Sequence, residues 1–361
     1  MAIISCINLP KRIISTPHSR NQTFNRCTIY KEENPMIRQF DDFMTANRIN
    51  MLKLPIATTL KDKQKTYYIG ETSTAIREKI IKKHYDSICD TFEIEKSPTD
   101  YDLFKEATSG SGNEWMEINQ LNSSTLLAFL CFHKVSKDRK FVFDDVEYSE
   151  VHFEVQSPLR PNGQSKPVSN MDVVLLNEDR SKALFIESKF TEYLSAGKPE
   201  VSSYYKEPYE KIFGNDCKVN FRMGNTDKSF SIRNNKWTST VRGLYLEGLK
   251  QMVCHYLGIL HCIEEGSNKL SDCARLWKGD DKVLSGTMEI KLGAILYKFN
   301  DTKFESYESA YEGLAKVLNA HAARRLAIVK TIQTYQNLFT SDDNDKLLDE
   351  RVRNFYFAME R

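Results

Sequence analysis

Three charged residues near the middle of the chain have the types and the spacing that metal-assisted chemistry requires. Asp172 lies in the apolar run MDVVLLN (171–177), and Glu187 and Lys189 lie near the end of a second run, ALFIESKF (183–190). Side chains alternate across a strand, so Glu187 and Lys189 share one face with Phe185. Charges are rarely buried on such a strand without a partner or a metal ion.

The short polar segment between these runs, residues 178–182, predicts a hairpin of two antiparallel strands. Folding the hairpin would bring Asp172 beside Glu187, and the two carboxylates would repel each other unless a cation joined them. Mg²⁺ is bound by one or two carboxylates with waters and phosphate oxygens, and Mn²⁺ is the expected substitute. This chemistry suits phosphodiester hydrolysis, with Lys189 orienting the attacking water or stabilising negative charge.

The neighbouring segments predict a mixed sheet flanked by helices, an α/β (α+β) fold. The order of elements is helix, three strands, helix, strand and closing helices. Apolar periodicity, capping residues and β-forming residues place them at residues 122–135, 151–157, 171–177, 183–190, 244–263, 288–299 and 306–339.

With its elements placed, the constellation resembles the Asp…Glu-x-Lys signature of the PD-(D/E)xK nuclease superfamily. Fourteen residues separate Asp172 from Glu187, and Glu187-Ser188-Lys189 follows as the second part of the motif. The run IESKFTE (186–192) is similar to a bacterial restriction-endonuclease-like branch, although Met171 stands where the motif has proline. The resemblance covers residues 117–300. It implies a restriction-endonuclease-like core with a central four-stranded mixed sheet, and helical additions at both ends.

The resemblance also implies further site residues and a DNA substrate. Gln251 matches a glutamine on the helix that supports the site in several members. The family often adds an acidic residue from the helix before the first core strand. Glu117 is the favoured candidate, so the implied metal ligands are Asp172, Glu187 and Glu117. Glu114 and Glu154 are the alternatives.

Several features have competing interpretations. A second Glu-x-Lys, Glu289-Ile290-Lys291, has only a polar loop upstream and is interpreted as a decoy. The first could instead be a salt-bridged pair on an exposed edge strand. The basic residues Arg77, Lys79, Lys82 and Lys83, in a predicted helix at 72–96, are interpreted as a solvated helix face rather than a DNA-binding stripe. The polar excursion at about 195–240 suits a nucleic-acid-contacting insertion or ordinary surface equally. Zinc binding by cysteines and histidines between 254 and 262 is disfavoured, because no second ligand cluster faces them.

Composition limits the class of protein and its partners. The 361 residues include 51 basic and 49 acidic side chains, a net charge of +2 that neither demands nor excludes a nucleic acid. The eight cysteines form no CxxC pair, which predicts reduced thiols and a cytoplasmic location. No apolar run is long enough for a membrane span. The predicted organisation is an N-terminal region of unknown role (1–110), a nuclease core (111–305) and C-terminal helices (306–361).

The sequence therefore predicts a Mg²⁺-dependent deoxyribonuclease, an endonuclease acting in restriction, defence or DNA repair. Two alternatives stay open: a catalytically silent nucleic-acid-binding protein with the same fold, and a nuclease acting on RNA. A homodimer is a possible assembly, since one site per chain would need two copies to cut both strands in one encounter.

Overall fold

A computed structural model of the chain describes most residues from 73 onward. The described residues are 73–109, 115, 118, 123–158, 168–190, 205–214, 218–223, 225–233, 236–239, 246–264, 288–298, 302–321, 325–341 and 343–357. Glu114 and Glu117 lie outside them.

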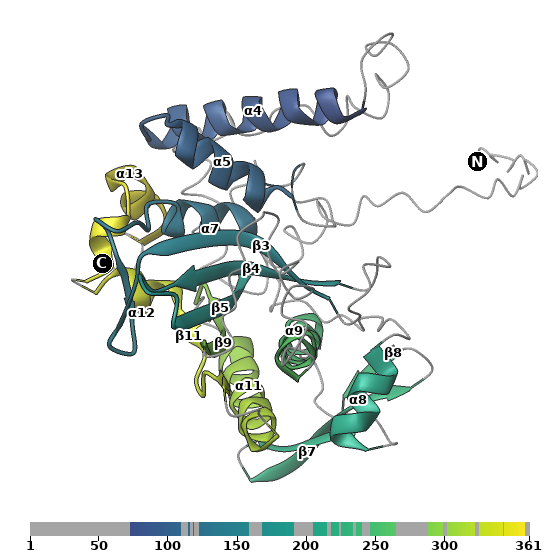
Figure 1. Ribbon diagram of the computed structural model, residues 1–361. Coiled ribbons are helices and arrows are strands. Elements are labelled where there is room, and N and C mark those ends of the chain that lie inside the picture. Colours follow the sequence, from purple (N-terminus) through teal and green to yellow (C-terminus); the bar gives the residue numbers. More distant parts are fainter. Residues whose placement is uncertain are drawn as a thin grey trace, which may run out of the picture.

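A six-stranded mixed sheet forms the centre of the fold (Figure 1). Its strand order is β10-β9-β5-β4-β3, and β11 pairs with the far end of β9. Strands β3, β4 and β5 are antiparallel neighbours, whereas β9 runs parallel to β5, and β10 and β11 run parallel to β9. The bounds are β3 Glu150–Pro158, β4 Val168–Leu176, β5 Lys182–Lys189, β9 Glu289–Leu296, β10 Leu326–Ile328 and β11 Gln333–Thr334.

This sheet confirms the predicted hairpin and corrects the predicted number of strands. The four expected strands are β3, β4, β5 and β9, but two short strands add to them. Both lie within residues 306–339, where the sequence predicted two helices. The first helix forms as α11 (Thr302–Ala320), and the second is replaced by β10, β11 and the short α12 (Tyr335–Phe339). Strands of two or three residues are set by pairing with β9, so their own sequence carries little periodicity.

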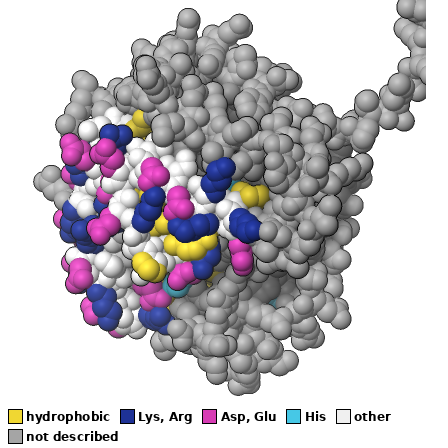
Figure 2. Space-filling view, turned by 90° about the horizontal axis from the view of Figure 1, so that it is seen from above, with side chains coloured by type: hydrophobic (Ala, Val, Ile, Leu, Met, Phe, Trp, Pro, Cys, Tyr) yellow, Lys and Arg dark blue, Asp and Glu magenta, His cyan; other side chains and the backbone are white. Residues whose placement is uncertain are grey.

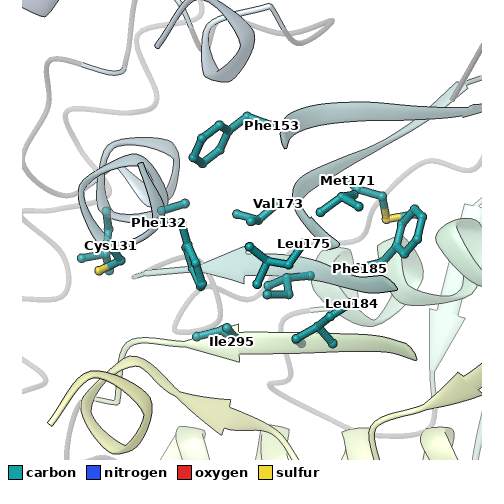
Figure 3. Packing of buried hydrophobic residues seen from close by; sticks show 14 of the residues in the cluster. Cys131, Phe132, Phe153, Met171, Val173, Leu175, Leu184, Phe185 and Ile295 are labelled. Carbon is teal, nitrogen blue, oxygen red and sulfur yellow. The ribbon is translucent and has the colours of Figure 1, made fainter. Parts of the chain in front are cut away.

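Helices cover both faces of the sheet (Figure 1). On one face lies α7 (Ser124–Phe132), with α5 (Pro98–Ala107) and α4 (Ser73–Phe92) beyond it; on the other lie α9 (Leu246–Glu264) and α11. Ser123 caps α7 by accepting a hydrogen bond from the Leu126 backbone nitrogen at 3.3 Å. Figure 3 shows Phe132 of α7 directed at the strands beside Val173 and Leu175. Because both faces are covered, β4 and β5 are apolar on both sides.

The alternation predicted for β5 is confirmed by what its side chains contact. Ser188 donates from Oγ to the Ser124 carbonyl oxygen of α7 at 3.3 Å. Glu187, the preceding residue, contacts His255 of α9 on the opposite face. The hairpin therefore directs Glu187 and Lys189 toward α9 and leaves Ser188 on the α7 side.

The remaining described elements lie outside the central sheet. The excursion at 195–240 contains α8 (Lys206–Phe213) and a three-stranded antiparallel sheet of β6 (Lys218–Met223), β7 (Thr226–Arg233) and β8 (Lys236–Ser239), where the sequence analysis placed only a long polar segment. A two-stranded ribbon, β1 (Phe141–Phe143) and β2 (Val146–Tyr148), precedes β3, and the chain closes with η5 (Asp345–Leu347), α13 (Glu350–Val352) and η6 (Arg353–Phe357).

The surface over α4 and α5 carries both signs of charge. Figure 2 views the molecule from this side and shows lysine and arginine side chains interspersed with acidic ones. Lys82 pairs with Asp86 of the same helix, with nitrogen and oxygen 2.5 Å apart. This mixture favours the solvated-face interpretation of the basic residues in α4. Of the helices described, none has the length and apolar character needed to cross a membrane.

Candidate active site

The candidate site forms where β4 and β5 stop pairing through their backbones. The paired residues run from Leu176 and Ala183 to Val173 and Ile186. At the next position Asp172 turns its side chain to β5, and its Oδ2 accepts a hydrogen bond from the Ser188 backbone nitrogen at 2.6 Å. The carboxylate thus takes the place of a backbone partner, and this fixes Asp172 beside the Glu-x-Lys segment.

Glu187 lies at the centre of the site and is 1% exposed. Its Oε2 is 2.5 Å from Nε2 of His255, and its Oε1 forms an ion pair with Nζ of Lys189. The same Nζ lies 4.0 Å from Oδ2 of Asp172. The lysine amine is therefore close to both carboxylates, and the structure brings together the three residues predicted from the sequence.

The electrostatics of the site keep Glu187 ionised. Burial alone would raise the pKa of this carboxyl group, because a buried charge loses its hydration. The positive charge of Lys189 and the neighbouring His255, together with hydrogen bonds from both, outweigh burial and lower the pKa of Glu187 below its usual range. An ionised carboxylate only accepts hydrogen bonds, so Nε2 of His255 must carry the hydrogen.

His255 is a member of the site that sequence reasoning did not assign. It lies on the same helix as Gln251, among the histidines and cysteines that the sequence analysis considered only as unlikely zinc ligands. It is 1% exposed, and its Nδ1 contacts Oγ of Ser169, at the start of β4. The available signal was its position, one helical turn after Gln251 on an apolar helix, which puts both on one side of α9.

Gln251 lies on α9 as expected, but no described contact joins it to the carboxylates. Its side chain is partly buried, and its Oε1 has no hydrogen-bond partner among the residues described. Its supporting role stays a prediction.

Only one of the three candidate third carboxylates falls in the described structure. Glu154 lies on β3 between the register pairs Phe153–Val173 and Val155–Met171, at the level where β4 carries Asp172, although the two residues are not themselves a register pair. It is 5% exposed and its φ angle is +51°. A non-glycine residue in this left-handed region stores about 1–3 kcal/mol of strain, and such strain concentrates at functional sites.

The second Glu-x-Lys differs from the first in burial. Glu289 is exposed at the start of β9, and Lys291 pairs with Asp144 across 2.8 Å with both side chains at least one-third exposed. Lys189 in the first motif is 8% exposed as a side chain. The exposure of the second motif therefore agrees with its interpretation as a decoy. The alternative for the first motif, a salt-bridged pair on an exposed edge strand, does not fit, because β5 lies between β9 and β4 and Lys189 is buried.

The site offers two carboxylates as possible ligands for a metal ion. Within the described part of the chain, no group of three or more histidine, cysteine, aspartate or glutamate side chains is arranged to hold a metal ion. Both ring nitrogens of His255 already have partners in Glu187 and Ser169. Two carboxylates remain, Asp172 and Glu187, and Mg²⁺ is bound through one or two carboxylates with waters and phosphates.

A comparison with protein families bears on these residues. Residues 53–229 match the family model described as restriction endonuclease associating with ARP. This match supports a restriction-endonuclease-like family and a nuclease-like role. It contains Asp172, Glu187 and Lys189 but ends before α9, so His255 lies beyond it. No curated protein and no solved structure matches the chain.

Proposed function

We propose that the chain is a metal-dependent deoxyribonuclease that hydrolyses phosphodiester bonds, most simply as an endonuclease of restriction, defence or repair. One observation carries the proposal. The carboxylates of Asp172 and Glu187 and the amine of Lys189 converge on the α9 face of the sheet, at the end of two buried strands. The restriction-endonuclease-like family match, which covers all three residues, supports the same reaction class.

Asp172 and Glu187 would hold Mg²⁺, or Mn²⁺ in its place. When bound, the ion would supply a water of lowered pKa and would neutralise charge on the phosphate. The protein contributes a fixed geometry. The Ser188 backbone nitrogen orients Asp172, and β5 carries Glu187 and Lys189 on one face.

Lys189 would act on the phosphate or on the attacking water. Its amine already lies within 4.0 Å of Asp172 and contacts Glu187, so it borders the place where both carboxylates meet. A buried ammonium group there stabilises negative charge as it develops on the phosphate oxygens, and its strength is greatest where water is excluded. Gln251 would support the site from α9.

A second candidate function is nucleic-acid binding without cleavage, and one observation favours it. The Glu187 carboxylate already has a cationic partner in Lys189 and a second partner in His255, so the site is internally compensated without a metal ion. Either function would show affinity for phosphates that falls as the salt concentration rises.

The experiment that separates the two is incubation of the purified chain with closed circular and linear DNA in Mg²⁺, Mn²⁺ or EDTA. Metal-dependent nicking of the circle supports an endonuclease, and loss from linear DNA alone indicates attack at free ends. DNA binding without consumption under every metal favours the silent protein. Single-stranded RNA in parallel reactions tests whether RNA is the substrate instead.

A further inference from the structure

We propose that His255 is a positioning residue that fixes the Glu187 carboxylate for metal binding, and that Ser169 in turn fixes His255. The inference deepens the proposed function and rests on it, because it assigns a task to a residue of the same site that the Asp…Glu-x-Lys pattern does not contain. Neither residue is part of the sequence prediction for the metal or the chemistry.

Two side-chain contacts of His255 connect three elements, α9, β5 and β4. His255 on α9 contacts Oε2 of Glu187 on β5 through Nε2, 2.5 Å away, and contacts Oγ of Ser169 on β4 through Nδ1. All three side chains are buried, with His255 and Glu187 each 1% exposed. An imidazole ring held at both nitrogens cannot rotate without losing a partner, so its direction toward Glu187 is set by the fold.

The two oxygens of Glu187 have different partners. His255 is bonded to Oε2 and Lys189 is paired with Oε1, from opposite ends of the carboxylate. A glutamate side chain otherwise has three rotatable bonds, and fixing them on metal binding costs free energy. The contact with His255 already restricts the Glu187 side chain before a metal ion binds, which reduces this entropic cost. Partners that orient a metal ligand in this way typically change metal affinity by about 10–100-fold when removed.

The chain of contacts continues from Ser169 to Tyr205, in the excursion at about 195–240. Tyr205, 6% exposed and immediately before α8, interacts with Ser169 and with Cys254, the neighbour of His255 on α9. Burial raises the pKa of Tyr205. Its hydroxyl therefore remains protonated and able to donate. Tyr205 therefore interacts with the serine that contacts the His255 ring.

The alternative is a purely structural histidine that fills space between α9 and the sheet. Such a role depends on ring volume and is satisfied by leucine, whereas positioning depends on a donor directed at Oε2. His255→Leu keeps an apolar side chain of moderate size but removes the donor. His255→Gln places an amide nitrogen near the position of Nε2 and restores it. His261→Leu on the last turn of the same helix is the matched control.

The test is Mn²⁺ binding, measured by calorimetry on the full chain without DNA, beside thermal unfolding in EDTA. We expect His255→Leu to bind Mn²⁺ about 10–100-fold more weakly than wild type, His255→Gln to recover part of the loss, and His261→Leu to match wild type. Ser169→Ala, a smaller change, is the second test and should weaken binding in the same direction while the protein stays folded.

The outcomes separate this inference from the proposed function. If wild type binds Mn²⁺ and a folded His255→Leu or Ser169→Ala variant binds it equally well, the positioning role is overturned. The proposed metal site is then unaffected. Equal loss in His255→Leu and His255→Gln also overturns it, because the donor would then be irrelevant. Wild type that binds neither Mn²⁺ nor Mg²⁺ removes the proposed metal site itself.

Discussion

Replacing Lys189 by methionine should destabilise the metal-free protein by about 3 kcal/mol. Methionine keeps the length and most of the volume of the lysine stem but removes the charge. Glu187 would then be an ionised carboxylate, 1% exposed, with His255 as its remaining described partner. Removing one member of a buried ion pair costs about 3–5 kcal/mol, because the other charge stays buried without compensation. We expect the lower end, since Nε2 of His255 lies 2.5 Å from Glu187.

Lys291→Met is the matched control for this substitution. Lys291 occupies the third position of the other Glu-x-Lys, on the adjacent strand β9, and pairs with Asp144 in solvent. Exposed ion pairs contribute about 0–1 kcal/mol. The same chemical change should therefore cost several times less at Lys291 than at Lys189.

The assay is urea unfolding in EDTA at pH 7, followed by circular dichroism, for wild type, both single variants and Lys189→Met combined with Glu187→Gln. The double variant should be more stable than Lys189→Met alone, with a coupling free energy of about 1–3 kcal/mol, because the neutral amide no longer needs a cation. A Lys189→Met protein as stable as wild type, or a cost equal to that of Lys291→Met, would refute the buried pair.

Two further predictions concern the sheet and its border. Gly293→Ala should lower the thermal unfolding midpoint, because a Cβ at this position would lie 2.9 Å from Cγ2 of Val329. The expected loss in the free energy of unfolding is about 1–3 kcal/mol. If adding Val329→Ala to this variant does not restore the midpoint, the contact is not the cause. Burial alone would lower the pKa of His152, but Glu106 and Glu150 raise it to about 9. The protonated histidine therefore contributes up to about 3 kcal/mol to the free energy of unfolding below pH 6.5, and this contribution should be lost as the pH rises through 9. Urea midpoints across pH 6–10 measure the loss, and a His152→Asn variant with the same profile would contradict it.

The elements that could be predicted from the sequence are those whose residues show a local pattern of apolar and polar side chains. The apolar runs around Val173 and Ile186 and the short polar link between them contain the hairpin, and alternation alone assigned Glu187 and Lys189 to one face. The periodicity of residues 244–263 gave α9, which spans Leu246–Glu264. These features depend on neighbours within a few residues, which is why one sequence is enough.

The rest depends on contacts between distant residues. β10 and β11 exist only because β9 offers its free edge and its far end, and nothing in their few residues requires it. The contact between His255 and Ser169 joins positions 86 residues apart, so no spacing rule could reveal it. Glu154 comes level with Asp172 only through the β3–β4 register, whereas the family resemblance favoured Glu117, which lies outside the described residues.

The measurement that tests the central claim most directly is the rate of DNA nicking in Mg²⁺ by wild type, Lys189→Ala and Lys291→Ala. The account predicts metal-dependent nicking by wild type, a loss of about 100-fold or more in Lys189→Ala, and an unchanged rate in Lys291→Ala. Equal activity of the two variants, or nicking that persists in EDTA, would contradict a site built from Asp172, Glu187 and Lys189.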